Sequence, residues 1–201
     1  MASTHTARYL ADLVTIAQAL DADAIDRMVE IVVRTREQGG RLFIVGVGGG
    51  AGNANHAVCD FRKLAGIEAY APSDNTSELT ARINDNGWDS SYADWLRVSR
   101  LGARDCLFVM SVGGGNREKN VSMNLVAAME LAKGQGAAII AVVGRDGGEA
   151  ARLADAAVVV PVVNPETVTP HTESLQVAVW HLIVSHPDVL TGEMKWETIA
   201  R

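Results

Sequence analysis

The chain has 201 residues, a net charge of −6 and 48% hydrophobic residues. This length predicts one domain with a substantial core, and the absence of a basic stripe argues against a nucleic-acid-binding surface. No apolar run approaches the roughly 20 residues that span a membrane, and we expect no signal peptide. Cys59 and Cys106 lack metal-ligand spacing, so we expect a reducing, cytoplasmic compartment and neither a metal nor a cofactor.

Residues 4–39 are predicted to form two amphipathic helices. Apolar side chains recur there at helical spacing, and Gly39-Gly40 is a good stop signal for the second helix. Because no strand precedes these helices, their apolar stripes must be buried on the later part of the chain or on another subunit.

From residue 41 onward, short apolar strands alternate with helices. Strands with continuous rather than alternating apolar residues indicate a parallel sheet that is covered on both faces, so we predict an α/β fold. The expected strands are RLFIVG (41–46), IEAYAP (67–72), DCLFVMS (105–111), AAIIAVVG (137–144) and AAVVVPVV (156–163), and a final helix is expected over 171–186.

Two glycine-rich turns follow two of these strands, at 45–53 and at 111–117, and each is expected to lead directly into a helix. Backbone N–H groups at such turns suit a phosphate, although a plain tight turn also needs glycine. Gly46 to Ala51 formally fits the G-x-G-x-x-G/A fingerprint, but the acidic residue of a dinucleotide fold is not in place. The two turns together therefore predict one small-anion site.

Two longer motifs, NTSELTARINDNGWD (75–89) and GRDGGEAARLAD (144–155), accompany FIVGVGGG and FVMSVGGGN. Together they resemble the sugar isomerase (SIS) domain family, and most of all its phosphoheptose isomerase branch. The resemblance covers nearly the whole chain and implies a three-layer αβα sandwich around a five-stranded parallel sheet. It also implies a homotetramer that binds sugar phosphate at subunit interfaces. Within a single domain we expect a helical pair (1–40), an α/β core (41–187) and a peripheral extension (188–201).

The phosphate loops depart from the family pattern. The family's G-N-G-G-S and S-T-S-G-N-S loops carry hydroxyls, most of which are glycines here, so backbone amides with Ser111 and Arg117 are expected to hold the phosphate. Arg117 and Lys119 are expected in the first turn of the following helix. The expected binding residues are Gly48, Gly49, Asn53, Ser111, Gly113, Gly114, Asn116 and Arg117 of the turns, and Thr76, Ser77, Asn84 and Asp85 of the 75–89 motif.

The family's H-x-x-x-E motif, whose glutamate is the base and whose two residues can ligate zinc, is also altered. Aligned through LAG (64–66), its positions fall on Cys59 and Lys63. Lys63 could then stabilise an oxyanion, although a solvated helix residue explains it equally.

The family's Q-E-x-H motif falls on Glu173 and Gln176 when it is aligned on His181. We therefore expect Glu173 as a relocated base and His171 as the acid that opens the sugar ring, although an ordinary helix start also accounts for both. His181 lies in an apolar run and is expected to be a core histidine. Further acid–base candidates are His56, Asp60, Glu78 and Asp85.

Two functions remain open on these grounds. The first is a phosphorylated-sugar aldose–ketose isomerase, which would convert sedoheptulose 7-phosphate to a heptose 7-phosphate through an enediol. The second is a regulatory module that binds sugar phosphate without catalysis, because the family's acid–base residues are displaced. We expect the isomerase.

Overall fold

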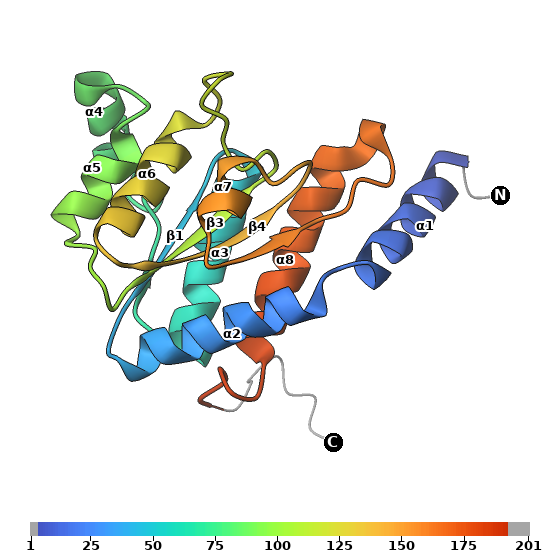
Figure 1. The fold of residues 1–201 in the computed structure, drawn as a ribbon, viewed down its shortest axis with the longest axis horizontal. Coiled ribbons are helices and arrows are strands. Elements are labelled where there is room, and N and C mark those ends of the chain that lie inside the picture. The colour runs from blue at the N-terminus through green and yellow to red at the C-terminus, as the bar shows by residue number, and fades with distance from the viewer. Residues whose placement is uncertain (1–3, 193–201) are drawn as a thin grey trace.

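The computed structural model describes residues 4–192. Its centre is a sheet of five parallel strands in the order β2-β1-β3-β4-β5, with helices on both faces (Figure 1). The predicted α/β fold is therefore confirmed. The strands are β1 (Leu42–Gly46), β2 (Ala69–Tyr70), β3 (Cys106–Ser111), β4 (Ala138–Val143) and β5 (Ala156–Val159).

Each face of the sheet has its own hydrophobic core. On β3, Phe108 and Met110 point into the core shared with one helical layer, whereas Leu107 and Val109 point into the other, and all four are fully buried. Burial on both faces is the reason that the strands are apolar at every position. One layer holds α2 (Ala22–Glu37), α3 (Gly49–Leu64) and α8 (Val168–Ser185), and the other holds α5 (Ser91–Val98), α6 (Met123–Gly134) and α7 (Gly148–Leu153).

Two helices lie at the margins of this sandwich. In α1 (Thr4–Gln18) the only buried residue is Ile16, and Leu10 and Val14 are more than half exposed. Helix α4 (Thr76–Asn86) has no buried residue, and a 3-10 turn at Pro165–Thr167 leads into α8. The expectation that the first two helices bury their apolar stripes thus holds for α2, while much of the stripe of α1 is open. Helix α1 lies at the margin of the sandwich (Figure 1).

The segment after β3 differs from the expectation. Helix α6 begins only at Met123, because the backbone groups of Asn116 and Val121 pair with each other at 2.9 Å in both directions and close a loop. Arg117 and Lys119 lie in this loop, so their predicted place in the first turn of a helix is wrong. Arg117 forms an ion pair with Glu130 of α6.

Strands β1 and β3 are neighbours, and the helices that follow them go to opposite layers. A crevice for ligands opens at such a switch point, beyond the carboxyl ends of the strands. Both glycine-rich turns lie at this edge of the sheet, as predicted. In the part of the chain that the structure describes, no helix has the length and apolarity to cross a membrane. Residues 193–201 of the expected C-terminal extension lie outside the described residues.

Candidate active site at the glycine turns and along helices α3 and α8

Three glycines of the first turn are explained by its geometry. Gly48 has φ +59°, which favours glycine, and a Cβ on Gly46 would lie 2.3 Å from the carbonyl carbon of Gly50. A Cβ on Gly50 would lie 2.5 Å from the carbonyl oxygen of Met110, at the end of β3. These glycines let α3 start directly against the sheet, so they need no ligand to account for them.

Gly49 leaves room for a side chain of α8. A Cβ at this position would lie 2.4 Å from a carboxylate oxygen of Glu173. Asn53 holds α8 here by donating from Nδ2 to the Glu173 carbonyl at 3.0 Å and to Gln176 Oε1 at 2.9 Å. The first turn of α3, where N–H groups and the helix dipole favour an anion, therefore has the protein's own carboxylate beside it.

The second turn is braced against the loop before α7. Ser111 Oγ accepts the N–H of Gly114 at 3.1 Å, and a Cβ on Gly114 would lie 2.0 Å from the carbonyl oxygen of Gly147. Asn116 Oδ1 accepts the N–H of Lys119 at 2.8 Å within the same loop. A Cβ on Gly113 would lie 3.7 Å from the guanidinium of Arg145. Arg145, which the sequence reasoning did not single out, thus places a cation beside this turn.

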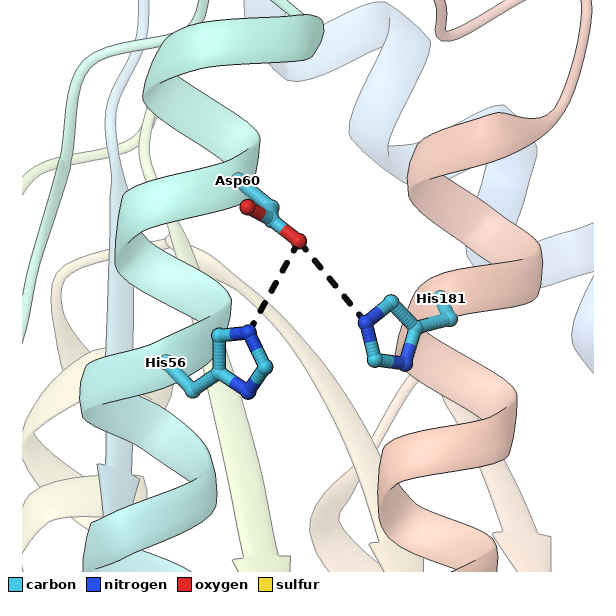
Figure 2. A group of neighbouring side chains, drawn as sticks. All are labelled: His56, Asp60 and His181. Carbon is cyan, nitrogen blue, oxygen red and sulfur yellow. Dashed lines mark ion pairs between the residues drawn. The ribbon is translucent and has the colours of Figure 1, made fainter. Parts of the chain in front are cut away.

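Along the seam between α3 and α8, three polar side chains meet (Figure 2). Asp60 Oδ2 lies 4.0 Å from His56 Nε2 and 3.7 Å from His181 Nε2. The Asp60 side chain is only 7% exposed and its Oδ2 has no hydrogen-bond partner, whereas the side chains of His56 and His181 are 57% and 37% exposed. A buried carboxylate therefore lies at the base of a partly open site between two imidazoles.

The hydrogen bond made by His181 Nδ1 indicates which nitrogen of this ring carries a proton. His181 Nδ1 lies 2.9 Å from the carbonyl oxygen of Val177, and because a carbonyl can only accept, Nδ1 carries a proton. A neutral His181 would then turn a bare Nε2 toward Asp60 Oδ2, and the two lone pairs would repel. A proton on Nε2, or a cation between the two atoms, would remove this repulsion.

The same three residues meet the requirements of a divalent metal ion. Their ligand atoms all lie within 4.8 Å of one another, and imidazole nitrogen and carboxylate oxygen are ligands that Zn²⁺ takes. The bond from His181 Nδ1 to Val177 leaves Nε2 available, as in many zinc sites. A divalent ion bound here would supply a Lewis acid that polarises a carbonyl oxygen. The sequence reasoning, which named His56 and Asp60 only as further acid–base candidates, did not identify this set.

The expected catalytic residues His171, Glu173 and Lys63 do not come together. The ring of His171 is buried and stacks on Tyr9 of α1 at 4.2 Å. Lys63 is exposed in the last turn of α3. From Gly49, which Glu173 adjoins, to Lys63 there are 14 residues of helix, or about 21 Å at 1.5 Å per residue. One reacting centre in one chain cannot use all three.

Comparison with known proteins identifies the family. A family model described as the SIS domain matches residues 7–144. The chain belongs to the SIS domain family. This SIS domain protein is 35% identical over 188 residues to the lincomycin biosynthesis protein LmbN of Streptomyces lincolnensis, covering 88% of this chain and 66% of that protein. It is 31% identical over 168 residues to the phosphoheptose isomerase of Rhodospirillum rubrum, covering 81% of this chain and 83% of that protein.

The solved structures agree with the sequence relatives. Phosphoheptose isomerase GmhA from Neisseria gonorrhoeae superposes with a TM-score of 0.77 at 25% identity, covering 92% of this chain and 97% of that chain. The SIS domain protein described here thus belongs to the phosphoheptose isomerase branch, and the predicted resemblance is confirmed.

The His56, Asp60 and His181 cluster offers a second match to the family's H-x-x-x-E motif. His56 and Asp60 keep the H-x-x-x-acid spacing, which places both on one face of a helix. Alignment through residues 64–66 instead places this motif three positions later, on Cys59 and Lys63. The expectation that His181 is a core histidine is wrong, because its side chain is 37% exposed and faces Asp60.

The remaining predicted residues of the SIS motif 75–89 lie on or next to α4. Thr76, Ser77, Asn84 and Asp85 are all exposed, and Asn84 donates to Asp85 at 2.9 Å. Asn75 caps the helix by accepting the N–H of Glu78 at 3.2 Å. Their place in a sugar site stays a prediction.

Proposed function

We propose that this SIS domain protein is an aldose–ketose isomerase of a phosphorylated sugar, with Asp60 as its base. The observation that carries the proposal is the buried carboxylate of Asp60, whose Oδ2 accepts no hydrogen bond and faces the imidazoles of His56 and His181. Isomerisation through an enediol needs a base at a carbon and an acid at the neighbouring oxygen. This cluster offers both within one site.

In the proposed mechanism, Asp60 removes the proton from the carbon next to the carbonyl group. His181, protonated at Nε2 and held by Val177, donates a proton to the carbonyl oxygen to give the enediol. The reverse transfers on the neighbouring atoms, from Asp60 to carbon and from the adjacent hydroxyl to His181, complete the isomerisation. Trp180, which is fully buried, packs edge-on to His56 at 4.8 Å and limits water on that side.

The phosphate is assigned to the second glycine turn, close to Ser111, Gly113 and Arg145. At the first turn the Glu173 carboxylate would repel it, and this carboxylate is better suited to accept hydrogen bonds from sugar hydroxyls. We infer that the sugar is sedoheptulose 7-phosphate, because the relatives named above include enzymes called phosphoheptose isomerase.

The spacing of the site supports assembly of several copies. Asp60 lies 11 residues into α3 from Gly49, or about 16 Å along the helix from the edge of the sheet where both turns lie. A heptulose 7-phosphate has seven bonds between its carbonyl carbon and its phosphorus, about 9 Å when extended. We therefore infer that the turns of one chain face the Asp60 cluster of another, in a cytoplasmic homotetramer. The exposed apolar face of α1, with Leu10 and Val14, is available for such packing.

A solvent-exchange assay tests the reaction. In D₂O with sedoheptulose 7-phosphate, the wild-type protein is expected to place deuterium on the carbon next to the carbonyl group, as read by NMR. Asp60→Asn should slow this exchange by at least about 10²-fold while sugar-phosphate affinity stays within a few-fold, since a general base contributes about 10²–10⁴. Asp26→Asn, the same change on the exposed surface of α2, is the control and should behave as the wild type.

Glu173→Gln separates the two candidate bases. We expect this variant to keep deuterium exchange and to bind sugar phosphate with altered affinity. If Glu173→Gln stops exchange and Asp60→Asn does not, Glu173 is the base and the assignment given above is wrong. A wild-type protein that binds sugar phosphate without any exchange would instead support the regulatory module.

A further inference from the structure

A second cavity lies at the opposite edge of the sheet, where the strands begin. Its volume is about 370 Å³, within the range of small-molecule sites. Its wall is formed by the end of α2, the loop before β3, the end of α6 and the residues that open β4 and β5. Nothing in the proposed isomerase reaction uses this cavity.

Three cations from three segments line the cavity: Arg34, Arg104 and Lys133. Within residues 4–192, none of their side chains has an ion-pair or hydrogen-bond partner. The helix dipole explains why Arg34 and Lys133 each lie at a helix C-terminus. It does not explain Arg104, which lies in a loop, nor why all three cations line one cavity. In a chain of net charge −6, such a concentration of unpaired positive charge requires another explanation.

The two carboxylates on the wall leave this charge largely uncancelled. Asp105 is fully engaged, because its oxygens accept from the Arg41 side chain at 2.8 and 3.2 Å and from the Arg41 and Gly102 N–H groups at 2.9 and 2.8 Å. Asp155 accepts the N–H of Ile139 through one oxygen at 2.8 Å, and its other oxygen remains available to a hydroxyl donor.

The charges of Arg34 and Asp155 both act on Cys106, the first residue of β3. Burial raises the pKa of the Cys106 thiol, Asp155 raises it further and Arg34 lowers it. Both charges are therefore felt at the start of β3, although the side chains of Arg34 and Asp155 are themselves exposed.

We propose that this cavity is a second binding site, for a small phosphorylated molecule that carries hydroxyl groups. Arg34, Arg104 and Lys133 pair with the phosphate, and the free oxygen of Asp155 and the amide of Gln38 take the hydroxyls. The site is separate from the proposed isomerase centre, and it does not depend on that reaction.

Ribose 5-phosphate, inorganic phosphate and ribose are the probes for this site. In ¹⁵N NMR titrations, ribose 5-phosphate is expected to shift the amide signals of residues 102–105 and 135–138, inorganic phosphate to shift them with weaker affinity, and ribose to leave them unchanged. Arg104→Gln/Lys133→Gln should weaken ribose 5-phosphate binding there at least about tenfold, because two of the three cations are lost. Rising salt should weaken it as well.

The control is Arg97→Gln/Arg152→Gln, which removes the same charge from two exposed arginines that pair with acidic neighbours on their own helices. It should bind ribose 5-phosphate as the wild type does. Equal losses in both double variants, or shifts confined to residues 111–117 and 144–148, would overturn the proposal. Asp60→Asn should leave binding at this cavity intact, so failure of the isomerase assignment and failure of this site are distinguishable.

Discussion

The contact between α3 and β3 at Gly50 sets a sharp test of the fold around the first turn. A Cβ there would lie 2.5 Å from the backbone oxygen of Met110, whereas ordinary contact begins at 3.4 Å, so Gly50→Ala requires a shift of about 0.9 Å in the helix or the strand. Such overpacking costs about 1–3 kcal/mol, and the better helix propensity of alanine returns up to about 1 kcal/mol. We expect a net loss of about 1–2 kcal/mol in the free energy of unfolding.

The neighbouring substitution Gly49→Ala is the matched control. Its Cβ would meet only the end of the Glu173 side chain, which can rotate away, so stability should stay constant or rise by up to about 1 kcal/mol. Sugar-phosphate affinity should then change as it does in Glu173→Gln, because the carboxylate is displaced from the turn.

Urea unfolding and thermal melting at one fixed protein concentration compare the two variants with the wild type. For a chain of this size, the expected loss lowers the Tm of Gly50→Ala by about 2–8 °C. Equal stability of Gly49→Ala and Gly50→Ala would show that the close approach of α3 to β3 is not the reason for glycine at position 50.

Two further predictions concern buried polar groups. Tyr92 donates to the Gly46 carbonyl at 2.7 Å, and burial raises the pKa of Tyr92 to about 12. Because the unfolded chain loses this proton at a lower pH than the folded chain does, the free energy of unfolding should fall as pH rises from 10 to 12. In urea titrations, Tyr92→Phe should lower the free energy of unfolding by about 1 kcal/mol at pH 7 and weaken its decline above pH 10. An unchanged decline would refute this role of Tyr92. Asp105→Ala should lower the free energy of unfolding, measured in urea, by about 2–4 kcal/mol, because Arg41 loses its buried partner. Asp94→Ala removes a partner from a more exposed pair and should lower it by less than about 1 kcal/mol. Similar losses in the two alanine variants would contradict the difference in burial.

The fold could be predicted because its signals are local. Continuous apolar strands such as residues 105–111 are buried on both faces, and the helices between them are of a length that a parallel sheet requires. The start of α6 could not be predicted in the same way. The polar run at 116–119 is compatible with a first helical turn, and only the pairing of Asn116 with Val121 shows that it is a loop.

The candidate site was predicted in part. The adjacency of the two turns follows from strand order, but the partner of Asp60 comes from a helix far along the chain, and no local pattern reports that His181 faces it. The spacing of His56 and Asp60 is visible in the sequence, because residues four apart share one face of a helix. The position of Glu173 beside Gly49 depends on how α8 packs against α3, which is again a property of the assembled layers.

The weak attachment of α1 has a consequence for how the protein behaves on dilution. A helix of 15 residues is marginal by itself, and here the described residues attach it through Ile16 and Leu13, the ring contact of Tyr9 with His171 and a hydrogen bond from Asn164 to Asp12. In the assembly proposed above, the neighbouring chain that covers Leu10 and Val14 would support this helix. Protease cleavage near residue 20 should therefore accelerate at low protein concentration while the sheet remains intact, and so report association rather than the stability of the core.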